Sequence, residues 1–213
     1  MSSKLNIIDH PVVKAQLTKL RHEATSPKEF REGIHNISFT LGIEASRTLE
    51  TQDVPGKSPV GSFVGTGIKP RIGLAPVLRA GLGMTDALLT LFPDAPVYHL
   101  GIFREKVTLQ PVEYYSKLPP HPTVDQVFLL DPLIATGGTA SAALTMITDW
   151  GVPEKNVKLL AVLASKPGLA NIQKLHPDLE IWVAAIDNEL TNQGIINPGL
   201  GDTGDRLFNT IRA

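Results

Sequence analysis

Residues 127–139 read Val-Phe-Leu-Leu-Asp-Pro-Leu-Ile-Ala-Thr-Gly-Gly-Thr, an apolar run followed by an acid and a short loop with two adjacent glycines. The run from Val127 to Leu130 is typical of a buried parallel strand. The two glycines allow a tight turn and a close approach of the backbone to a ligand. Free N–H groups of the helix expected next, with the hydroxyls of Thr136 and Thr139, would cradle a phosphate. Asp131 can accept hydrogen bonds from sugar hydroxyls, so the stretch predicts a ribose phosphate site; an ordinary strand–turn–helix junction is the alternative.

The composition disfavours several classes of protein. The chain of 213 residues has a formal net charge of −1, which gives no general attraction to nucleic acid or anionic membrane. It has no cysteine, and therefore neither a disulfide framework nor a thiolate metal site. No stretch approaches the roughly 18 apolar residues that span a bilayer, and residues 1–10 lack the apolar core of a signal peptide. We therefore expect a cytoplasmic protein without a membrane segment.

Two helices are expected near the N-terminus. Apolar residues recur at helical spacing at Val13, Leu17 and Leu20. A second helix start is marked by Ser26-Pro27-Lys28-Glu29, in which a capping serine precedes a proline and, three positions on, a glutamate. The apolar stripe that follows comprises Phe30, Ile34, Ile37, Leu41, Ala45 and Leu49. Such a stripe predicts a packing face, against the core or against another subunit.

Strand and helix patterns alternate after a loop-like segment. Residues 51–70 are rich in glycine and proline and are expected to form a loop or short edge strands. Beyond them the patterns indicate strands at 71–75, 97–103, 127–130, 157–164 and 180–186, and helices at 83–92, 139–150 and 167–175. This alternation predicts an α/β fold with a mostly parallel sheet flanked by helices. Such sheets bind ligands outside the carboxyl ends of their strands.

Three further segments carry residues suited to binding. Arg79 is the only charge in the glycine-rich loop 75–84; its guanidinium can bind two phosphate oxygens, although a surface arginine in a plain turn is the alternative. Arg104 follows a strand, and residues 110–122, with two tyrosines and four prolines, suit a mobile cover or an exposed hairpin. Residues 193–206 lack periodicity, and their fixed, irregular backbone would present N–H and C=O groups to a flat heterocycle, unless they form a surface tail.

These segments resemble one known family. Residues 131–139 resemble the phosphoribosyl-diphosphate (PRPP) motif of phosphoribosyltransferases, and Asp131-Pro132 is similar to the uracil phosphoribosyltransferase branch. That branch carries a segment similar to Leu78-Arg79-Ala80-Gly81-Leu82-Gly83-Met84. Its uracil-binding signature resembles Pro198-Gly199-Leu200-Gly201-Asp202 and Gly204-Asp205-Arg206. Because three separate motifs occur in the family's order, their joint weight far exceeds that of any single one.

The resemblance implies the type I phosphoribosyltransferase fold and a reaction. The expected reaction transfers the 5-phosphoribosyl group from PRPP to uracil, giving UMP and diphosphate in pyrimidine salvage. We expect one domain over residues 1–213. Its parts would be N-terminal helices at 1–50, an α/β core at 71–186, a flexible hairpin flap at 104–122 and a C-terminal base-binding segment at 187–210.

The resemblance also assigns roles to individual residues. The expected PRPP-binding residues are Arg79, Arg104, Asp131, Pro132, Leu133, Ile134, Ala135, Thr136, Gly137, Gly138, Thr139 and Asp202. The expected uracil-binding residues are Ile196, Gly201, Asp202 and Thr203. Asp202 and Arg104 are the catalytic candidates: Asp202 would steer the base and help its N1 lose a proton, with anchoring of the loop as the structural alternative. Thr203 and Asn197 depart from the residues common in the family, which leaves the fine shape of the base pocket open.

The resemblance further implies a cofactor and partners. Mg²⁺ is expected to bind mainly through PRPP and water. The expected partners are PRPP and uracil, without nucleic acid or membrane, with GTP as a candidate effector and a homodimer or homotetramer as the assembly. Two alternatives are an RNA-binding regulator of the same fold and a transferase for another base, such as orotate or a purine. The near-neutral charge disfavours the first and the C-terminal loop the second. A P-loop hydrolase is unlikely, because no Gly-x₄-Gly-Lys-Ser/Thr string is present.

Overall fold

The computed structural model of the protein describes residues 4–104 and 111–210. Its centre is an eight-stranded sheet with the order β1-β10-β9-β7-β4-β5-β6, in which the short β8 also pairs with β9. Neighbouring strands are parallel except β5 and β6, which are antiparallel. The strands of this sheet are β1 (Leu5–Ile7), β4 (Ile72–Leu78), β5 (Leu100–Arg104), β6 (Pro111–Ser116), β7 (Gln126–Leu130), β8 (Leu133–Ile134), β9 (Val157–Ser165) and β10 (Glu180–Asp187). The predicted α/β fold with a mostly parallel sheet is confirmed.

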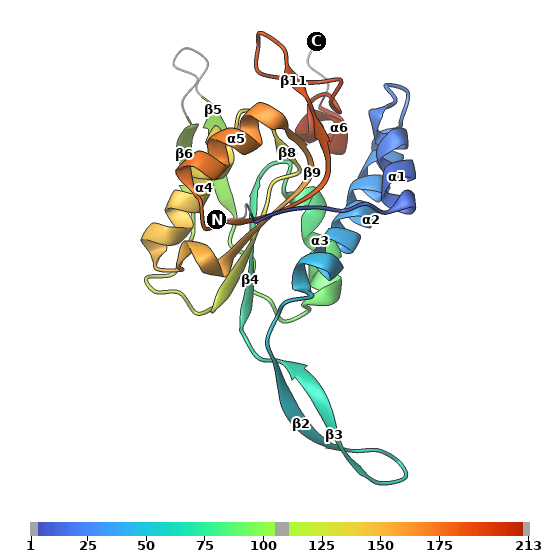
Figure 1. The fold of residues 1–213 in the computed structure, drawn as a ribbon, viewed down its shortest axis with the longest axis vertical. Helices are drawn as coiled ribbons and strands as arrows, with labels where there is room; N and C mark the ends of the chain where they lie inside the picture. The colour runs from blue at the N-terminus through green and yellow to red at the C-terminus, as the bar shows by residue number, and fades with distance from the viewer. Residues whose placement is uncertain (1–3, 105–110, 211–213) are drawn as a thin grey trace.

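Helices cover both faces of the sheet (Figure 1). One group comprises α1 (Pro11–Arg21), α2 (Pro27–Ser46) and α3 (Leu82–Leu91), and the other comprises α4 (Gly138–Trp150) and α5 (Lys166–Leu175). Successive residues of a strand point to opposite faces. Accordingly, Phe128 and Leu130 pack in the core cluster with α1, α2 and α3, whereas Val127 and Leu129 pack in the cluster with α4 and α5. A short 3₁₀ helix, η1 (Glu154–Asn156), precedes β9.

The predicted start of the second helix is confirmed by its hydrogen bonds. The N–H of Glu29 donates to Ser26 Oγ at 3.3 Å, and Glu29 Oε2 accepts from the N–H of Ser26 at 3.0 Å. This reciprocal capping box gives hydrogen-bond partners to two backbone N–H groups at the start of the helix. The stripe from Phe30 to Ala45 is buried as expected, but Leu49 lies beyond the last helical residue, Ser46.

Strand β4 is longer than predicted, because it continues past Ala75 to Leu78. Proline is disfavoured inside a central strand since it has no N–H to donate. On the β5 side, Leu74 pairs with Val97 and Val77 pairs with Leu100 in one register, and the pairing is interrupted between them. Pro76 lies in this gap, where its missing N–H donor is tolerated, while the ladder to β7 continues to Pro76.

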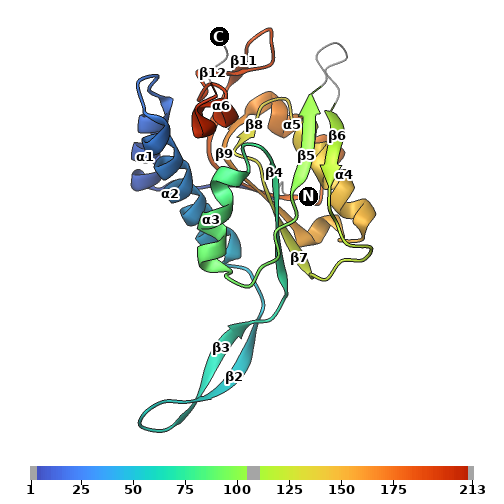
Figure 2. The same ribbon diagram turned by 180° about the vertical axis from the view of Figure 1, so that it is seen from behind.

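The N-terminal third differs from the expectation at one strand and decides between two alternatives at residues 51–70. Strand β1 pairs with β10 at the sheet edge, where no strand was predicted. Of the two alternatives for residues 51–70, the structure has strands and not a loop: β2 (Thr51–Lys57) and β3 (Ser62–Ile68) pair with each other over seven residues each, as a two-stranded sheet separate from the main one. This hairpin projects from the rest of the molecule (Figure 2). Its turn is closed by the N–H of Ser58, which donates to the carbonyl of Gly61 at 2.8 Å.

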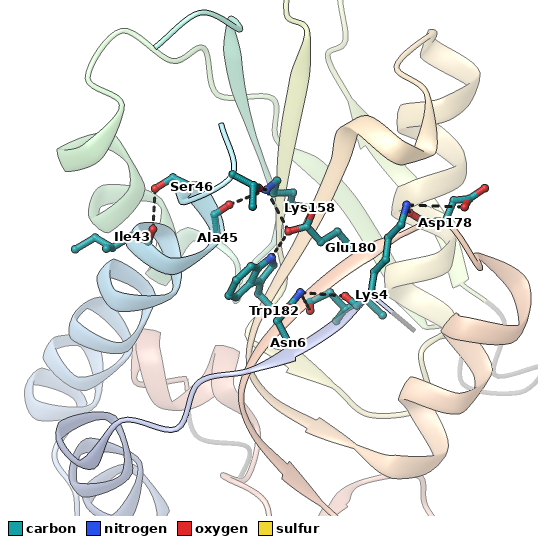
Figure 3. A network of polar contacts seen from close by, with 11 residues as sticks. Lys4, Asn6, Ile43, Ala45, Ser46, Lys158, Asp178, Glu180 and Trp182 are labelled. Atoms are coloured by element: carbon teal, nitrogen blue, oxygen red, sulfur yellow. Dashed lines mark hydrogen bonds and ion pairs between the residues drawn. The ribbon is translucent and has the colours of Figure 1, made fainter. Parts of the chain in front are cut away.

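A buried lysine joins the end of α2 to the sheet (Figure 3). Lys158 Nζ donates to the carbonyl of Ala45 at 2.7 Å, to Thr48 Oγ1 at 2.7 Å and to Glu180 Oε1 at 3.1 Å. Trp182 Nε1 donates to the same Glu180 oxygen at 2.6 Å. Three partners satisfy the three ammonium protons, which offsets the cost of burying the charge. The network lies near the amino ends of β9 and β10 and links the end of α2 to these strands.

None of the helices in the described part of the chain is both long and apolar enough to cross a membrane.

Candidate functional site

The predicted binding segments follow the carboxyl ends of strands that lie in one sheet. The Arg79 loop follows β4, residues 131–139 follow β7, and the C-terminal segment follows β10. Because β4, β7, β9 and β10 are parallel, these ends meet at one edge of the sheet. Figure 1 shows β11, α6 and the ends of β5 and β8 at this edge, away from the β2–β3 hairpin.

The loop after β7 encloses a small cradle. A cavity of about 140 Å³ is lined by Asp131, Leu133, Ile134, Ala135, Thr136, Gly137, Thr139 and Ala140. Gly137 is the residue before α4 and has a φ of 83°, which side chains rarely adopt. A Cβ at this position would also lie 2.7 Å from the carbonyl oxygen of Gly168. Glycine is therefore required at position 137, where a tight turn was predicted, for two reasons. The backbone conformation disfavours a side chain, and the carbonyl of Gly168 leaves no room for a Cβ.

The junction of β9 and α5 holds this cradle in place. Ser165 Oγ donates to the carbonyl of Ala135 at 2.5 Å and accepts from the N–H of Gly168 at 2.9 Å. Asn171 Nδ2 donates to the carbonyl of Thr136 at 3.1 Å. Sequence reasoning missed these supporting residues. The available signal was Ser165-Lys166-Pro167, a capping serine before a proline, which marks a helix start.

Asp131 lies at the edge of the cradle and is 8% exposed. Burial raises the pKa of this carboxyl to about 7, and the backbone N–H of Leu133, which lowers the pKa, only partly opposes that effect. A carboxyl with this pKa changes its charge near neutral pH, so a ligand that donates hydrogen bonds would favour the ionised form.

The Arg79 loop lies between the end of β7 and the C-terminal segment. Arg79 Nη2 donates to Asp205 Oδ1 at 2.8 Å, and Arg79 Nη1 donates to Thr210 Oγ1 at 3.1 Å. A Cβ on Gly81 would lie 2.4 Å from the carbonyl oxygen of Leu130, the last residue of β7 and the residue before Asp131. The loop is therefore close to the point at which the cradle begins and is hydrogen-bonded to the C-terminal segment.

The C-terminal segment is more regular than predicted. Strands β11 (Glu189–Leu190) and β12 (Ile196–Asn197) form a short antiparallel pair, and α6 (Thr203–Phe208) is a helix that the sequence pattern did not indicate. The missed signal was Asp202 as the residue that caps a helix. Between them the bond from Asn197 to Pro198 is cis.

The predicted base-site residues lie on this segment in different environments. Ile196 and Thr203 are buried, whereas Gly201 and Asp202 are exposed. Asp202 Oδ1 accepts from the N–H of Asp205 at 3.0 Å, which is the anchoring contact of the structural alternative. Thr203 Oγ1 is buried and has no hydrogen-bond partner in the described part of the chain. Thr203 thus places a hydroxyl without a partner among the described residues beside the loop.

The predicted flap is described only in part. Arg104 is the last residue of β5; its side chain and residues 105–110 lie outside the described residues, so its predicted role is not placed here. Residues 111–116 form β6, antiparallel to β5, which is the strand pairing of a hairpin. Tyr114 and Tyr115 are 54% and 44% exposed, and Tyr114 contacts the ring of Phe103 with centroids 6.1 Å apart.

Comparisons with known proteins agree with one another. The family described as "Uracil phosphoribosyltransferase" matches residues 7–210. A uracil phosphoribosyltransferase of Alkaliphilus metalliredigens is 46% identical over 209 residues, 98% of this chain and 99% of that protein. One of Roseiflexus is 46% identical over 208 residues, 98% of this chain and 99% of that protein. The solved structure of the AQ2163 protein from Aquifex aeolicus is 32% identical, with a TM-score of 0.90 and coverage of 98% of this chain and 100% of that one.

Proposed function

Because the chain belongs to the uracil phosphoribosyltransferase family, we propose that the carboxyl edge of its sheet holds the residues that transfer the 5-phosphoribosyl group from PRPP to uracil. The reaction gives UMP and diphosphate in pyrimidine salvage. The placement of the Arg79 loop between the end of β7, where the cradle begins, and the C-terminal segment is the observation that supports this site most directly.

The cradle suits the 5′-phosphate. Residues Thr136 to Thr139 surround the start of α4, where backbone N–H groups without helical partners favour an anion. The left-handed Gly137 brings the backbone close to the phosphate oxygens. Pro132, Leu133, Ile134 and Ala135 form the connection between Asp131 and this anion site. Asp131 in its ionised form accepts hydrogen bonds from ribose hydroxyls and so orients the sugar.

The leaving diphosphate requires positive charge. Arg79 and Arg104 would supply it, and a guanidinium can bind two phosphate oxygens at once. During the reaction the bond between ribose C1 and a diphosphate oxygen breaks, a bond from uracil N1 to C1 forms, and uracil N1 loses its proton, for which Asp202 is the candidate acceptor. Donors placed at the oxygen that gains charge stabilise this transition state more than the bound substrate.

The base would be read by the backbone of the C-terminal segment. We assign the carbonyl of Ile196 to the N3–H donor of uracil, and the N–H groups of Gly201 and Thr203 to its carbonyl oxygens. Cytosine carries an acceptor at N3, so two acceptors would face each other. Asp202 would contact PRPP and steer N1, and its capping of α6 fixes the carboxylate in place for that role.

Mg²⁺ would offset the charge of the diphosphate as it leaves. Among the described residues, no three His, Asp or Glu side chains gather in a way that could hold a metal ion. The single buried Asp131 at the cradle fits an ion whose other ligands are PRPP oxygens and water. Residues 104–122 would cover the site after PRPP binds and exclude water. Protection of residues 110–122 from a protease by PRPP tests this cover; equal cleavage with and without PRPP contradicts it.

The β2–β3 hairpin supports a homo-oligomer, either a homodimer or a homotetramer. An isolated two-stranded hairpin is marginally stable in water, yet this one exposes Val54, Val60, Phe63, Val64 and Ile68. Light scattering of the wild type and of Val60→Ser/Phe63→Ser/Val64→Ser tests this assembly. GTP as an effector stays a prediction from the resemblance, which titration of GTP into the assay checks.

A spectrophotometric assay with PRPP, Mg²⁺ and a panel of bases tests the function. We expect turnover of uracil and none of cytosine, orotate or hypoxanthine. Turnover of another base would favour the alternative transferase. Absence of any turnover, together with a gel shift of uridine-rich RNA, would favour the regulator.

A further inference from the structure

A buried ion pair lies behind the base segment, outside the set of residues assigned to the substrates. Arg21 is the last residue of α1, and Asp187 is the last residue of β10. Arg21 Nη1 donates to Asp187 Oδ2 at 2.8 Å, and Nη2 donates to Oδ1 at 2.6 Å. The side chain of Asp187 is 8% exposed and that of Arg21 is 27% exposed. Two parallel bonds of this kind fix the relative orientation of both side chains.

The same pair binds both polar backbone groups of Gly199. Asp187 Oδ2 accepts from the N–H of Gly199 at 2.9 Å, and Arg21 Nη1 donates to its carbonyl at 2.9 Å. Gly199 has a φ of 64°, and a Cβ there would lie 2.2 Å from the carbonyl oxygen of Ile196. The ion pair therefore fixes the turn that abuts the carbonyl assigned to uracil N3–H.

One side of this turn packs in the core, where Leu200 is buried, and the other side faces a cavity. A cavity of about 610 Å³ separates residues 198–202 from the connection between α1 and α2. Arg206 lines this cavity and links its two sides. Its Nη1 donates to the carbonyls of Leu200 at 2.8 Å and Leu20 at 2.5 Å, and its Nη2 donates to the carbonyl of His22 at 2.7 Å. Where one side of a loop faces a cavity, its conformation depends on such polar contacts.

We propose that Arg21 and Asp187 are positioning residues for base recognition, and that their ion pair sets the place of the Ile196 carbonyl through Gly199. The proposal rests on the proposed function, since it deepens the base site of that reaction. Neither residue is among those assigned to the substrates. Loss of the pair would leave the cradle and the Arg79 loop intact, because neither of them contacts it through a hydrogen bond in the described part of the chain.

The test separates the two substrates. Arg21→Gln and Asp187→Asn should each raise KM for uracil about tenfold or more, the effect expected from losing a charged hydrogen bond, with KM for PRPP within about twofold of wild type. Arg21→Lys keeps the charge but cannot reach Asp187 and Gly199 in the same geometry. It should give a smaller rise, again confined to uracil.

Arg71→Gln is the matched control. Arg71 also binds a carboxylate through two bonds, to Asp125 at 3.1 and 2.9 Å, but lies at the amino ends of β4 and β7. This variant should leave both KM values unchanged. Thermal melts of all variants report folding, and Arg21→Lys decides the outcome if Arg21→Gln does not fold.

An unchanged KM for uracil in a folded Arg21 variant, or equal rises for uracil and PRPP, overturns the proposal. Failure of the proposed function is distinct from this result, because the wild type would then not convert uracil at all.

Discussion

Arg79 and Asp205, which are 126 positions apart in the chain, form an ion pair in which Arg79 Nη2 donates to Asp205 Oδ1 at 2.8 Å. Thr210 Oγ1 donates to the same Asp205 oxygen at 2.7 Å. The loop assigned to the diphosphate is therefore already attached to the segment assigned to the base before any substrate binds. The arginine side chain is half exposed, so PRPP can reach it.

Replacing Arg79 with Gln should lower kcat/KM for PRPP by about 10²-fold or more, the scale seen when one donor to a developing oxyanion is removed. The reason is that glutamine lacks the positive charge that balances the leaving diphosphate. Steady-state kinetics with varied PRPP measure the effect. Arg47→Gln, which removes an exposed guanidinium paired with Glu44, is the control. An Arg79→Gln enzyme with wild-type PRPP dependence would remove Arg79 from the site.

Replacing Asp202 with Asn should sharply lower turnover without loss of the fold. Asparagine caps helices about as well as aspartate, so the contact with the N–H of Asp205 is kept while the charge is lost. Turnover and thermal melts are measured on the same preparation. Near wild-type turnover would leave Asp202 with its capping role alone.

The stability of the free protein should fall as pH rises from about 4 to 7 through Asp131. Its pKa rises from 3.8 to about 7 on folding because it is buried. Between these values the folded chain binds more protons than the unfolded chain, and unfolding is then favoured by increasing pH. At about 1.4 kcal/mol per pKa unit, the full effect is on the order of 4 kcal/mol. Urea unfolding at pH 5 and pH 8 measures it.

Asp131→Asn is neutral at every pH and should flatten this dependence. The same variant should bind PRPP more weakly, and the ratio of its Kd to the wild-type Kd should grow from pH 6 to pH 8, as the wild-type carboxylate ionises. The titration of PRPP itself cancels in this ratio. A ratio independent of pH would show that ribose does not select the ionised form.

The fold was largely predictable because its signals are local. The capping box at Ser26, the buried run before Asp131 and the glycines of the cradle each follow from a few adjacent residues. The sequence does not distinguish a loop from strands at residues 51–70, because β2 and β3 pair only with each other and both faces of their hairpin are exposed. Their residues therefore show no alternation of buried and exposed positions that would mark a strand. Strand β1 has three residues, too few for a period.

For the site, the sequence motifs predict only the residues assigned to the substrates, and those roles stay predictions. The hydrogen bonds that support the site, such as those from Ser165 to Ala135 and from Arg21 to Asp187, join residues that lie far apart in the sequence and belong to no motif. Helix α6 was not predicted, because Asp202 was interpreted as part of a binding signature and not as the residue that caps a helix.

Lys158→Met should destabilise the protein by about 1–3 kcal/mol, since the buried carbonyl of Ala45 and the Glu180 carboxylate each lose a donor. The network (Figure 3) is at the amino ends of β9 and β10, whereas the proposed site is at the carboxyl ends of the strands. Both KM values should therefore stay at wild-type levels. Chemical denaturation measures the change; an unchanged midpoint would contradict the assigned role.

The convergence of the three segments is tested most directly by a crystal structure of the protein with UMP and diphosphate. We predict the 5′-phosphate on the N–H groups of residues 137–139, the diphosphate against Arg79, and uracil N3–H on the carbonyl of Ile196. A nucleotide whose phosphate or base binds away from these groups would contradict the account.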